Sequence, residues 1–504
     1  MVDSSIIDKF FNPKSIAVIG ASRKPYGAAH TILSSVIYKN YAGDIYLVNN
    51  SACGEKLYER PLYKTILDCP KVDLAFIVVP GKYVKSVIED CIELGITNGV
   101  IISSGFKESI LYDESKVKLE KEILALAREN GLRLIGPNCN GVINLPTSFY
   151  AFFGPRLKVQ PGHCSYVTRG GTAGGFILMG SAQFGRDLGV NKLVNIGDAC
   201  DLTIGDFIQY YEQDPLTKVI GVYTEGITNG SKLLQILRKV KKPVIFYKSG
   251  QTTAGQRAAL SHVGAIASAE TSSIYQGFIT QAGVIPANSL EDMLDLAAAF
   301  SHSVLPQGNK IGIFTFGGSL GVMMTDAAEK HGLNVAPLKQ ALIETLNDLL
   351  PEYWSHSNPI DITDGGSVYN PSIILKLFAR ILEEYDSLFL ITPVFENEQI
   401  WDYKKGEMNF RNMYREFIKQ NVRRYKRLTQ SASGAPNQNT RSGKPIFVLG
   451  EYGKISDLFY KHGIPLYESF EQMAKAFAGL LLYTKVLKKK KIMNNDGRIS
   501  LDII

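Results

Sequence analysis

The sequence predicts an α/β protein built from doubly wound parallel sheets that recur along the chain. Two patterns predict this fold: short apolar runs alternate with helix-like stretches, and most runs are apolar on both faces, as in parallel strands covered by helices. The length of 504 residues also suits roughly three domains of about 150 residues each. In such a fold, ligands are expected at the carboxyl ends of the strands.

The first 145 residues contain apolar runs that we predict to be parallel strands, with helix-like segments such as 82–94 and 112–130 between them. The runs are SIAVIG (15–20), DIYLVN (44–49), VDLAFIVVP (72–80), GVIISSG (99–105) and LRLIGP (132–137). The segment FGPRLKVQPGHC (153–164) interrupts this rhythm and indicates a linker.

Two further series follow the same plan. The second contains CSYVTRGG, KLVNIG, KVIGVYTEG, KPVIFYKSG and AGVIPA, ends near His302, and is followed by a boundary at SVLPQGNK (303–310). The third contains IGIFTFGGSLG, SLFLITPVF and KPIFVLG and closes with a predicted helix at 471–485. Between them, 410–428 has helical apolar spacing with basic residues opposite, which fits a solvated surface helix or a docking element for an acidic partner.

Composition excludes several classes of protein. The net charge is +7, and residues 404–428 alone carry nine Lys or Arg against two acids, so a general nucleic-acid surface is not indicated. The six cysteines are scattered without C-x-x-C spacing, which argues against a zinc site or a disulfide framework and favours a reducing cytoplasm. We find neither a signal peptide nor an apolar stretch of membrane-spanning length, and we predict no membrane association and no metal site.

The first glycine-rich turn, VIGASRKPYG, directly follows a predicted strand and leads into a helix. Gly20 and Gly27, with the small Ala21 and Ser22, would let backbone amides approach a phosphate. The turn is not a G-x-G-x-x-G fingerprint, and Asn49 and Asn50 stand where a dinucleotide domain usually has an acid for the ribose. This argues against an NAD-dependent dehydrogenase and leaves room for a ribose 3′-phosphate, as in coenzyme A.

Two later glycine-rich turns, within 167–182 and 314–329, also join a strand to a helix. Each would aim a helix N-terminus, equivalent to about half a positive charge, at a bound group. Either turn alone fits a packing feature. Together with a lone histidine between them in sequence, they form the set of groups that a phosphorylated intermediate requires.

That histidine is His262, in AALSHVGAIASAE. It is either an inconsequential surface imidazole or a reactive group carried on a movable loop of small residues. Glu225 ends the predicted strand KVIGVYTEG at the edge where doubly wound sheets place their sites. A carboxylate there could hold one imidazole nitrogen and leave the other free as a nucleophile.

The order of FNPKSIAVIGAS, GPNCNGVIN, YTEG, KSGQTTAGQRAALSHVGAIAS and FGGSLGVMMTDA resembles the α subunit of ADP-forming acetyl-CoA synthetases, within the succinyl-CoA synthetase superfamily. The resemblance runs from about residue 8 to 485. It implies a CoA-binding Rossmann-like domain at 1–148, a flavodoxin-like domain with a phosphohistidine loop at 160–303, and a second flavodoxin-like domain at 307–488. The last would contain the basic helical insertion at about 402–443.

The resemblance also implies site residues. It places the CoA phosphates at Gly20, Ala21 and Ser22, the length of CoA at Val79, Pro80 and Ser104, and its thiol end at Asn138 and Cys139. His262 would be phosphorylated and Glu225 would orient it. Phosphate would be held by Arg169, Gly170, Gly171 and Thr172 and by Gly317, Gly318 and Ser319. The family usually has serine at the position of Gly170, so a hydroxyl that contacts phosphate is absent.

The chemistry that the resemblance implies interconverts acyl-CoA, ADP and phosphate with a free carboxylic acid, CoA and ATP, through an acyl phosphate and a phosphohistidine. The sequence lacks an ATP-grasp segment. A separate ATP-grasp β subunit that binds Mg-ADP or Mg-ATP is therefore expected, in an α2β2 assembly. The alternative is a protein that senses CoA or acyl-CoA and has lost the chemistry.

Overall fold

The computed structural model describes residues 3–106, 114–182, 188–263, 272–363, 371–394, 443–453, 459–460 and 462–493. The chain forms two compact units: Met1–Ala182 with Gly189–Met293, and Gln183–Leu188 with Leu294–Ile504. The predicted basic insertion lies, apart from residue 443, outside the described residues. Within the described part of the chain, no helix is both long and apolar enough to cross a membrane.

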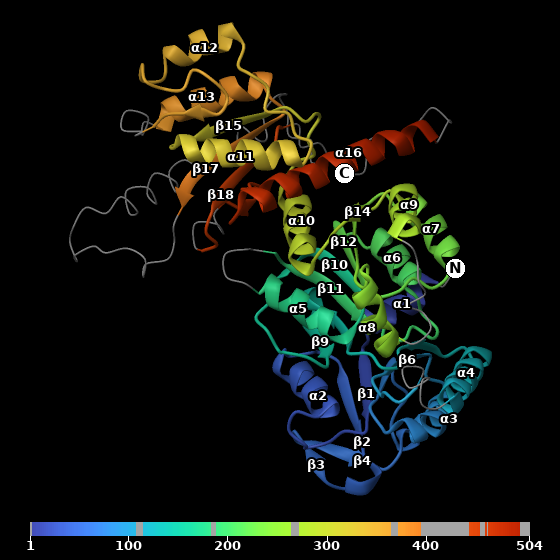
Figure 1. Ribbon diagram of the computed structural model, residues 1–504. Coiled ribbons are helices and arrows are strands. Elements are labelled where there is room, and N and C mark those ends of the chain that lie inside the picture. The colour runs from blue at the N-terminus through green and yellow to red at the C-terminus, as the bar shows by residue number, and fades with distance from the viewer. Residues whose placement is uncertain are drawn as a thin grey trace. The chain divides into compact units, whose positions relative to one another are not determined.

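The first sheet of the first unit has seven strands in the order β3-β4-β2-β1-β5-β6-β7 (Figure 1). Neighbouring strands are parallel except for the β3–β4 pair. The strands are β1 (Ser15–Ile19), β2 (Asp44–Val48), β3 (Lys56–Leu57), β4 (Arg60–Tyr63), β5 (Leu74–Ile77), β6 (Asn98–Ile101) and β7 (Arg133–Ile135). All of the apolar runs predicted in this region form strands of this sheet.

Helices cover both faces of this sheet because its strands are apolar on both sides. They are α2 (Ala28–Tyr38), α3 (Val84–Glu93) and α4 (Glu114–Glu129). Along β1, Ile16 shares a buried cluster with Val36 of α2, whereas Ala17 shares another with Ile88 of α3. Successive side chains of a strand point to opposite faces, so α2 and α3 cover opposite faces of the sheet.

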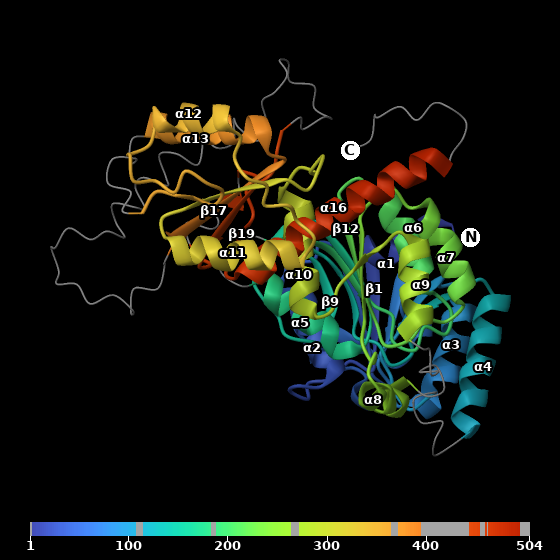
Figure 2. The same ribbon diagram turned by 45° about the horizontal axis from the view of Figure 1, so that its top comes forward.

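The second sheet of this unit has the order β14-β13-β12-β10-β11-β8-β9. Its strands are β8 (Gly141–Asn144), β9 (Phe149–Phe152), β10 (Pro161–Arg169), β11 (Val190–Asn195), β12 (Val219–Thr224), β13 (Val244–Lys248) and β14 (Ile285–Pro286). Its helices are α5 (Gly171–Ser181), α6 (Ile204–Gln213), α7 (Gly230–Lys239), α8 (Thr253–Val263) and α9 (Ser272–Ala282), and α10 (Leu290–His302) begins in this unit and belongs from Leu294 onward to the second unit. Helix α5 lies on one face, and α6, α7 and α9 lie on the other (Figure 2). The β8–β9 hairpin is antiparallel and extends the edge beyond β11.

Helix α1 (Ser4–Phe11) packs against helix α6 of the second sheet. The ring of Phe11 stacks on that of Tyr210 with centroids 5.4 Å apart, and the Tyr210 hydroxyl donates to Asp8 Oδ1 at 2.7 Å. Asn144 in β8 donates its amide to the Phe11 carbonyl at 3.1 Å. The N-terminal helix therefore joins the second sheet to the start of the first.

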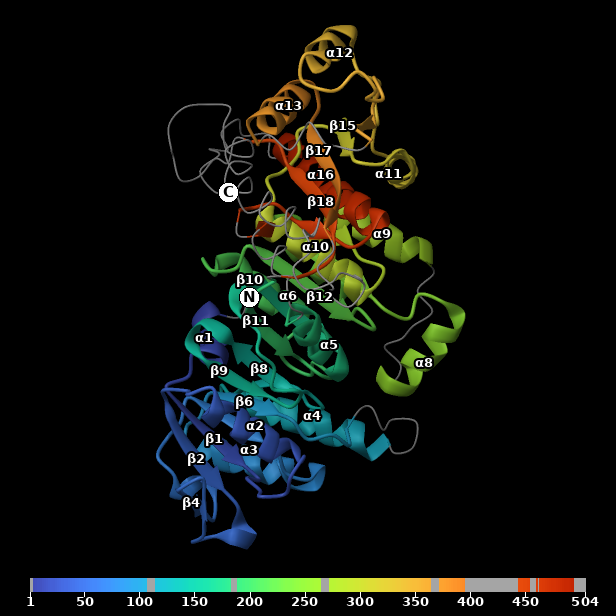
Figure 3. The ribbon, with the colours of Figure 1, turned by 90° about the vertical axis from the view of Figure 1, so that its left-hand side faces the viewer.

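The second unit contains a five-stranded parallel sheet in the order β16-β15-β17-β18-β19. The strands are β15 (Ile311–Thr315), β16 (Ile360–Asp361), β17 (Ser387–Val394), β18 (Ile446–Gly450) and β19 (Leu466–Tyr467), and the helices are α11 (Gly318–Lys330), α12 (Gln340–Asn347), α13 (Pro371–Glu384) and α16 (Phe470–Met493). In β17, Leu390 packs in one cluster with Phe378 of α13, while Phe389 packs in another with Phe477 of α16. The sheet is thus covered by α13 on one face and by α11 and α16 on the other (Figure 3).

Candidate active site

The Gly20 turn is held by the chain around it. The amides of Gly20 and Ala21 donate to the Val48 carbonyl at 2.9 and 3.1 Å. Asn49 donates its side-chain amide to the Ala21 carbonyl at 2.7 Å. Gly20 has a φ of 95°, and a Cβ there would collide with the Val78 carbonyl oxygen. Asn49, which stands where a dinucleotide domain usually has an acid, therefore serves to fix this turn.

The residues predicted to lie along CoA sit on neighbouring strand ends of the first sheet. The Ser103 hydroxyl donates to the Val79 carbonyl at 2.5 Å, and the Asn138 amide donates to the Ser103 carbonyl at 2.9 Å. Pro80 begins a short 3-10 turn directly after Val79. Ser104 is exposed beside Ser103. The structure thus brings the residues predicted to lie along CoA together at the carboxyl ends of neighbouring strands.

Cys139 cannot serve as a nucleophile in this arrangement. Its side chain is buried, and its thiol donates to the Ile101 carbonyl at 3.2 Å. Burial raises the pKa of the Cys139 thiol far above its ordinary value. A thiol with a raised pKa stays neutral and unreactive, so Cys139 fits a packing role beside Asn138.

The loop after β11 packs on the turn that contains Asn138. The Asp198 amide donates to the Pro137 carbonyl at 3.0 Å, and the Cys200 amide donates to the Gly136 carbonyl at 3.1 Å. Gly197 has a φ of 54°, and a Cβ there would collide with the Pro137 carbonyl oxygen. The carboxyl edges of the two sheets therefore face each other within the first unit.

Asp201 fastens this loop to the first sheet. Its buried carboxylate accepts hydrogen bonds from Arg133 Nε at 2.7 Å, Arg128 Nε at 2.8 Å and the Leu134 amide at 3.0 Å. Burial acts to raise the pKa of Asp201, but these hydrogen bonds outweigh it and hold the pKa below its ordinary value. Sequence reasoning missed Asp201, because its partners come from another part of the chain.

Glu225 lies beside the Gly170 turn. A Cβ on Gly170 would lie 3.1 Å from Glu225 Oε1 and 2.7 Å from Tyr223 Cε1. The Tyr223 hydroxyl is 3.3 Å from Glu225 Oε1 and 3.1 Å from Ser249 Oγ. Burial is the main cause that raises the pKa of Tyr223 to about 12, so its proton stays in place for Glu225. The ring of Tyr223 and a positive φ of 157° both favour glycine at position 170.

Asn195, at the end of β11, fixes the start of α5. Its side-chain amide donates to the carbonyls of Thr168 at 3.2 Å and Gly170 at 3.1 Å. Its side-chain oxygen accepts from the Asn140 amide at 2.8 Å. Gly170 is the N-cap of α5, and the helix starts at Gly171 without a side-chain cap among the described residues. The first turn of α5 therefore offers backbone amides, and Thr172 is exposed within it.

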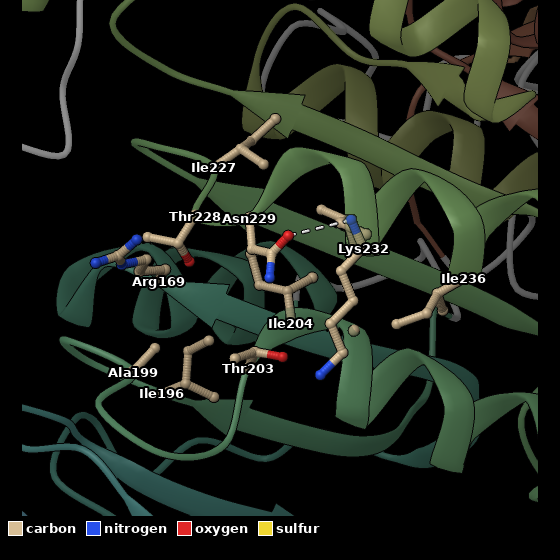
Figure 4. Close-up of a pocket in the computed structure, with 12 residues that line it drawn as sticks. Arg169, Ile196, Ala199, Thr203, Ile204, Ile227, Thr228, Asn229, Lys232 and Ile236 are labelled. Atoms are coloured by element: carbon tan, nitrogen blue, oxygen red, sulfur yellow. Dashed lines mark hydrogen bonds between the residues drawn. The ribbon is translucent and has the colours of Figure 1, made fainter. Parts of the chain in front are cut away.

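Arg169 is among the residues that line a cavity, together with residues of helices α6 and α7 (Figure 4). Its side chain is buried, and its guanidinium donates to the Asp198 carbonyl at 3.2 Å and the Gly226 carbonyl at 3.4 Å. Burial lowers the pKa of Arg169, whereas Asp198 and Glu225 act to raise it. The guanidinium therefore lies between the loop after β11 and the loop after β12.

The predicted loop around His262 is wrong for residues 253–263, which form helix α8. The segment is rich in Ala, Gln, Arg and Leu, which are good helix formers, and the Gly255 amide donates to Thr252 Oγ1 at 3.1 Å near the helix start. His262 is the penultimate residue of the helix, and its side chain lies outside those described. Residues 264–271, where the rest of the predicted loop falls, are also outside the described residues.

The Gly317–Ser319 turn belongs to the second unit. Gly317 is the N-cap of α11, with an extended φ of −166° and no side-chain cap among the described residues. Its amide donates to Thr315 Oγ1 at 3.2 Å, and the Thr315 hydroxyl donates to its carbonyl at 3.1 Å. Helix α11 thus starts, like α5, at a glycine turn directly after a strand and without a side-chain cap among the described residues.

Comparison with known proteins identifies the family. A model of a CoA binding domain matches residues 14–144, and a model of a succinyl-CoA ligase like flavodoxin domain matches residues 161–300. The α subunit of acetate–CoA ligase (ADP-forming) I from Pyrococcus furiosus is 33% identical over 496 residues, covering 96% of this chain and 99% of that one. The chain belongs to the family of ADP-forming acetate–CoA ligase α subunits.

Two further proteins support membership of the ADP-forming acetate–CoA ligase family. The isoenzyme II α subunit of P. furiosus is 32% identical and covers 95% of this chain and 98% of that one. In structure, the chain matches dinucleotide forming acetyl-coenzyme A synthetase 1 of Ca. Korarchaeum cryptofilum, in complex with phosphate and ADP, with a TM-score of 0.80 at 28% identity, covering 98% and 99% of the two chains. The predicted family and fold class are confirmed.

Proposed function

We propose that this chain is the α subunit of an NDP-forming acyl-CoA synthetase. It interconverts an acyl-CoA, either acetyl-CoA or a related thioester, plus ADP and phosphate with the free acid, CoA and ATP. The end-to-end match to α subunits of ADP-forming acetate–CoA ligases carries this conclusion. The same observation favours a working ligase over the alternative of a CoA-sensing protein.

The first unit would hold CoA along the carboxyl edge of its first sheet. We assign the CoA phosphates to the turn of Gly20, Ala21 and Ser22, and the thiol end to Asn138. Because the Gly20 and Ala21 amides already donate to Val48, this turn would bring the chain close to the phosphates rather than supply those two amides. The neutral, buried Cys139 would shape the thiol end without reacting.

The phosphoryl group would pass through His262. Inorganic phosphate attacks the thioester carbonyl, the C–S bond breaks, and CoA leaves as the thiol with an acyl phosphate remaining. His262 then attacks the phosphorus, so that an N–P bond forms, the P–O bond to the acyl group breaks, and the carboxylate leaves. Glu225 is the carboxylate we assign to orient the imidazole, since it lies at the Gly170 turn with the Tyr223 hydroxyl 3.3 Å away.

Charge on the transferring group would be stabilised by the N-termini of α5 and α11. Helix N-termini favour anions because their first amides are unpaired and the helix dipole is positive there. The α5 site would use the amides of Gly171 and Thr172 in place of the missing serine hydroxyl at 170. The α11 site would use Gly318 and Ser319.

A partner subunit would complete the enzyme. The relatives matched end to end are named α subunits. Acetate–CoA ligase (ADP-forming) II of Archaeoglobus fulgidus is named without a subunit, and this chain covers only 51% of its length. We assign Mg-ADP and Mg-ATP to an ATP-grasp β subunit in an α2β2 assembly, with a small carboxylic acid as substrate and the cytoplasm as location. The domain boundaries at 148–160 and 303–307 and the docking role of 402–443 stay predictions.

The test is co-expression with the ATP-grasp partner, followed by a coupled assay of ATP formation from ADP, phosphate and acetyl-CoA. We expect turnover by the wild-type pair and none by His262→Ala, with an acid-labile phosphohistidine at 262 in mass spectra of the wild-type chain only. The exposed His163→Ala provides the matched control and should keep full activity. Sustained ATP formation by His262→Ala would refute the phosphohistidine route.

A further inference from the structure

Tyr223 and Ser249 lie together at the carboxyl ends of two neighbouring strands. Strands β12 and β13 are parallel, and Thr224 pairs with Lys248 in their register. Ser249 follows β13 directly, and its amide donates to the Thr224 carbonyl at 3.0 Å. Glu225 follows β12 directly. The sheet therefore brings Tyr223, Glu225 and Ser249 to one edge.

The hydrogen bonds among these three side chains have a single consistent direction. The Tyr223 hydroxyl donates its one proton to Glu225 Oε1 at 3.3 Å. The second contact of this hydroxyl, 3.1 Å from Ser249 Oγ, must then take its proton from Ser249. The result is a chain of hydrogen bonds that runs from Ser249 through Tyr223 to Glu225, in which each bond polarises the next.

The hydroxyl of Tyr223 is not needed for the packing of its ring. The ring lies against the Gly170 turn, with Cε1 2.7 Å from the place that a Cβ of Gly170 would take. It also meets the ring of Tyr247 with centroids 5.4 Å apart. Phenylalanine would fill the same space, so what tyrosine adds at this position is the hydrogen bond to Glu225.

Ser249 begins the segment that leads to His262. Helix α8, which contains His262, starts at Thr253, four residues after Ser249. Within that segment, the side-chain amide of Gln251 donates to the Lys248 carbonyl at 2.8 Å, which holds the segment to the end of β13. The chain of hydrogen bonds therefore joins the carboxylate assigned to orient His262 to the strand end from which His262 is carried.

We propose that Tyr223 is a positioning residue for phosphoryl transfer, whose hydroxyl, fixed by Ser249, holds Glu225 in the orientation that receives the imidazole of His262. This inference rests on the proposed function and adds two residues to it. A carboxylate that is not held spends less time in the reactive orientation, and a misplaced catalytic group costs rate. Hydrogen bonds of catalytic groups are often long before substrate binds and shorten in the reactive complex, which fits the 3.1 and 3.3 Å separations.

The kinetic test uses the pair reconstituted with the ATP-grasp partner and the coupled assay of ATP formation. Tyr223→Phe keeps the ring and removes the hydroxyl, and it should lower kcat about tenfold, the effect of one hydrogen bond to a charged group, with an unchanged KM for acetyl-CoA. Ser249→Ala should lower kcat only about threefold, because Tyr223 keeps its own proton for Glu225. The double variant should match Tyr223→Phe, since Ser249 acts through the Tyr223 hydroxyl.

Tyr247→Phe is the matched control. Tyr247 pairs with Tyr223 in the strand register and contacts its ring, but its hydroxyl makes no hydrogen bond within the described part of the chain. This variant should keep the wild-type kcat. Rapid-quench mass spectrometry of the pair with ATP gives a second readout. Phosphorylation of His262 should slow about tenfold in Tyr223→Phe and reach the wild-type extent, whereas a folding defect would lower the extent.

A wild-type kcat in Tyr223→Phe would overturn the positioning role and leave the proposed function intact. So would a loss of kcat that Tyr247→Phe shares, or a raised KM for acetyl-CoA at unchanged kcat. If Tyr223→Phe does not fold, Ser249→Ala decides, and an unchanged kcat in that variant overturns the role. Failure of the wild-type pair to form ATP would refute the proposed function, and the role of Tyr223 with it, before any variant is made.

Discussion

The Gly20 turn and the Gly170 turn look alike in sequence but need glycine for different reasons. At Gly20 the obstacle is the backbone, because a Cβ would meet the Val78 carbonyl oxygen and φ is 95°. At Gly170 φ is also positive, at 157°, but the nearest obstacles are side chains, because a Cβ would lie 2.7 Å from the ring of Tyr223 and 3.1 Å from Glu225 Oε1. The Val78 carbonyl is part of the backbone and cannot be removed by a substitution, whereas the Tyr223 ring can rotate or can be removed by one.

The two turns also differ in what they leave available. The amides of Gly20 and Ala21 are used by Val48, and Asn49 holds the Ala21 carbonyl. At the second turn, Asn195 holds the Gly170 carbonyl, and the helix that starts at Gly171 has no side-chain cap among the described residues. A glycine turn between a strand and a helix is therefore not by itself an anion site. It can bind an anion only where its backbone amides do not already donate to other groups of the protein.

The largest effect is expected for Gly20→Ala. Collision with the Val78 carbonyl and a positive φ together should lower the free energy of unfolding by about 4 kcal/mol, measured by urea denaturation. Gly54→Ala is the control, because Gly54 has a φ of 86° with nothing within 4 Å of its Cβ position. That variant should lose only about 1 kcal/mol. Equal losses would show that the Val78 contact does not matter.

Asp201→Asn tests the contact between the carboxyl edges of the two sheets in the first unit. Loss of the buried charge that pairs with Arg133 and Arg128 should cost about 3 kcal/mol. Because the folded pKa of Asp201 lies below its ordinary value of about 3.9, its stabilisation is complete above about pH 4 and is lost as pH falls through the folded pKa. Chemical denaturation between pH 5 and 3 should therefore show a shallower decline for Asp201→Asn than for the wild type.

The control for Asp201 is Glu122→Gln, which removes an exposed ion pair with Lys85. It should leave the free energy of unfolding unchanged in neutral buffer. An equally steep decline in wild type and Asp201→Asn below pH 5 would contradict the assigned pKa shift.

The smallest effect on stability is expected for Gly170→Ser, at about 2 kcal/mol, since the new side chain meets the Tyr223 ring and φ is 157°. Tyr223→Leu in the same chain should restore part of this loss. The double variant should therefore lose less free energy of unfolding than the sum of the losses of the two single variants. Additive losses in thermal or urea denaturation would show that Tyr223 is not the obstacle. Gly20→Ala has no comparable rescue, because its obstacle is backbone.

Much of the fold was predictable from local patterns. Runs such as 16–19 and 219–222 are apolar at every position, which is typical of strands buried on both faces, and all runs of this kind form parallel strands. The hairpins at 56–63 and 141–152 were not predicted, because their strands are only two to four residues long. The loop expected around His262 was wrong at 253–263, where small residues that suit a loop also suit a helix.

The candidate site was less predictable than the fold. Glu225 could be placed at a strand end, and the structure has it directly after β12, whereas its place beside Gly170 came only from the structure. Asn195 and Asp201 carry no sequence signal of their own, because each acts through partners far away in the chain. Likewise, Arg169 directly precedes the glycines of the Gly170 turn in sequence, but its guanidinium donates to the carbonyls of Asp198 and Gly226, which only the packed structure decides.

Asp201 also bears on how this protein can change over generations. Its carboxylate sits in one domain, whereas Arg128 and Arg133 sit in the other. A recombination event that replaced either domain with that of another protein would leave Asp201, or Arg128 and Arg133, without an ion-pair partner unless the new domain carried the matching residue. The two halves of the first unit should therefore be inherited as a pair, even though each is recognisable as a separate module.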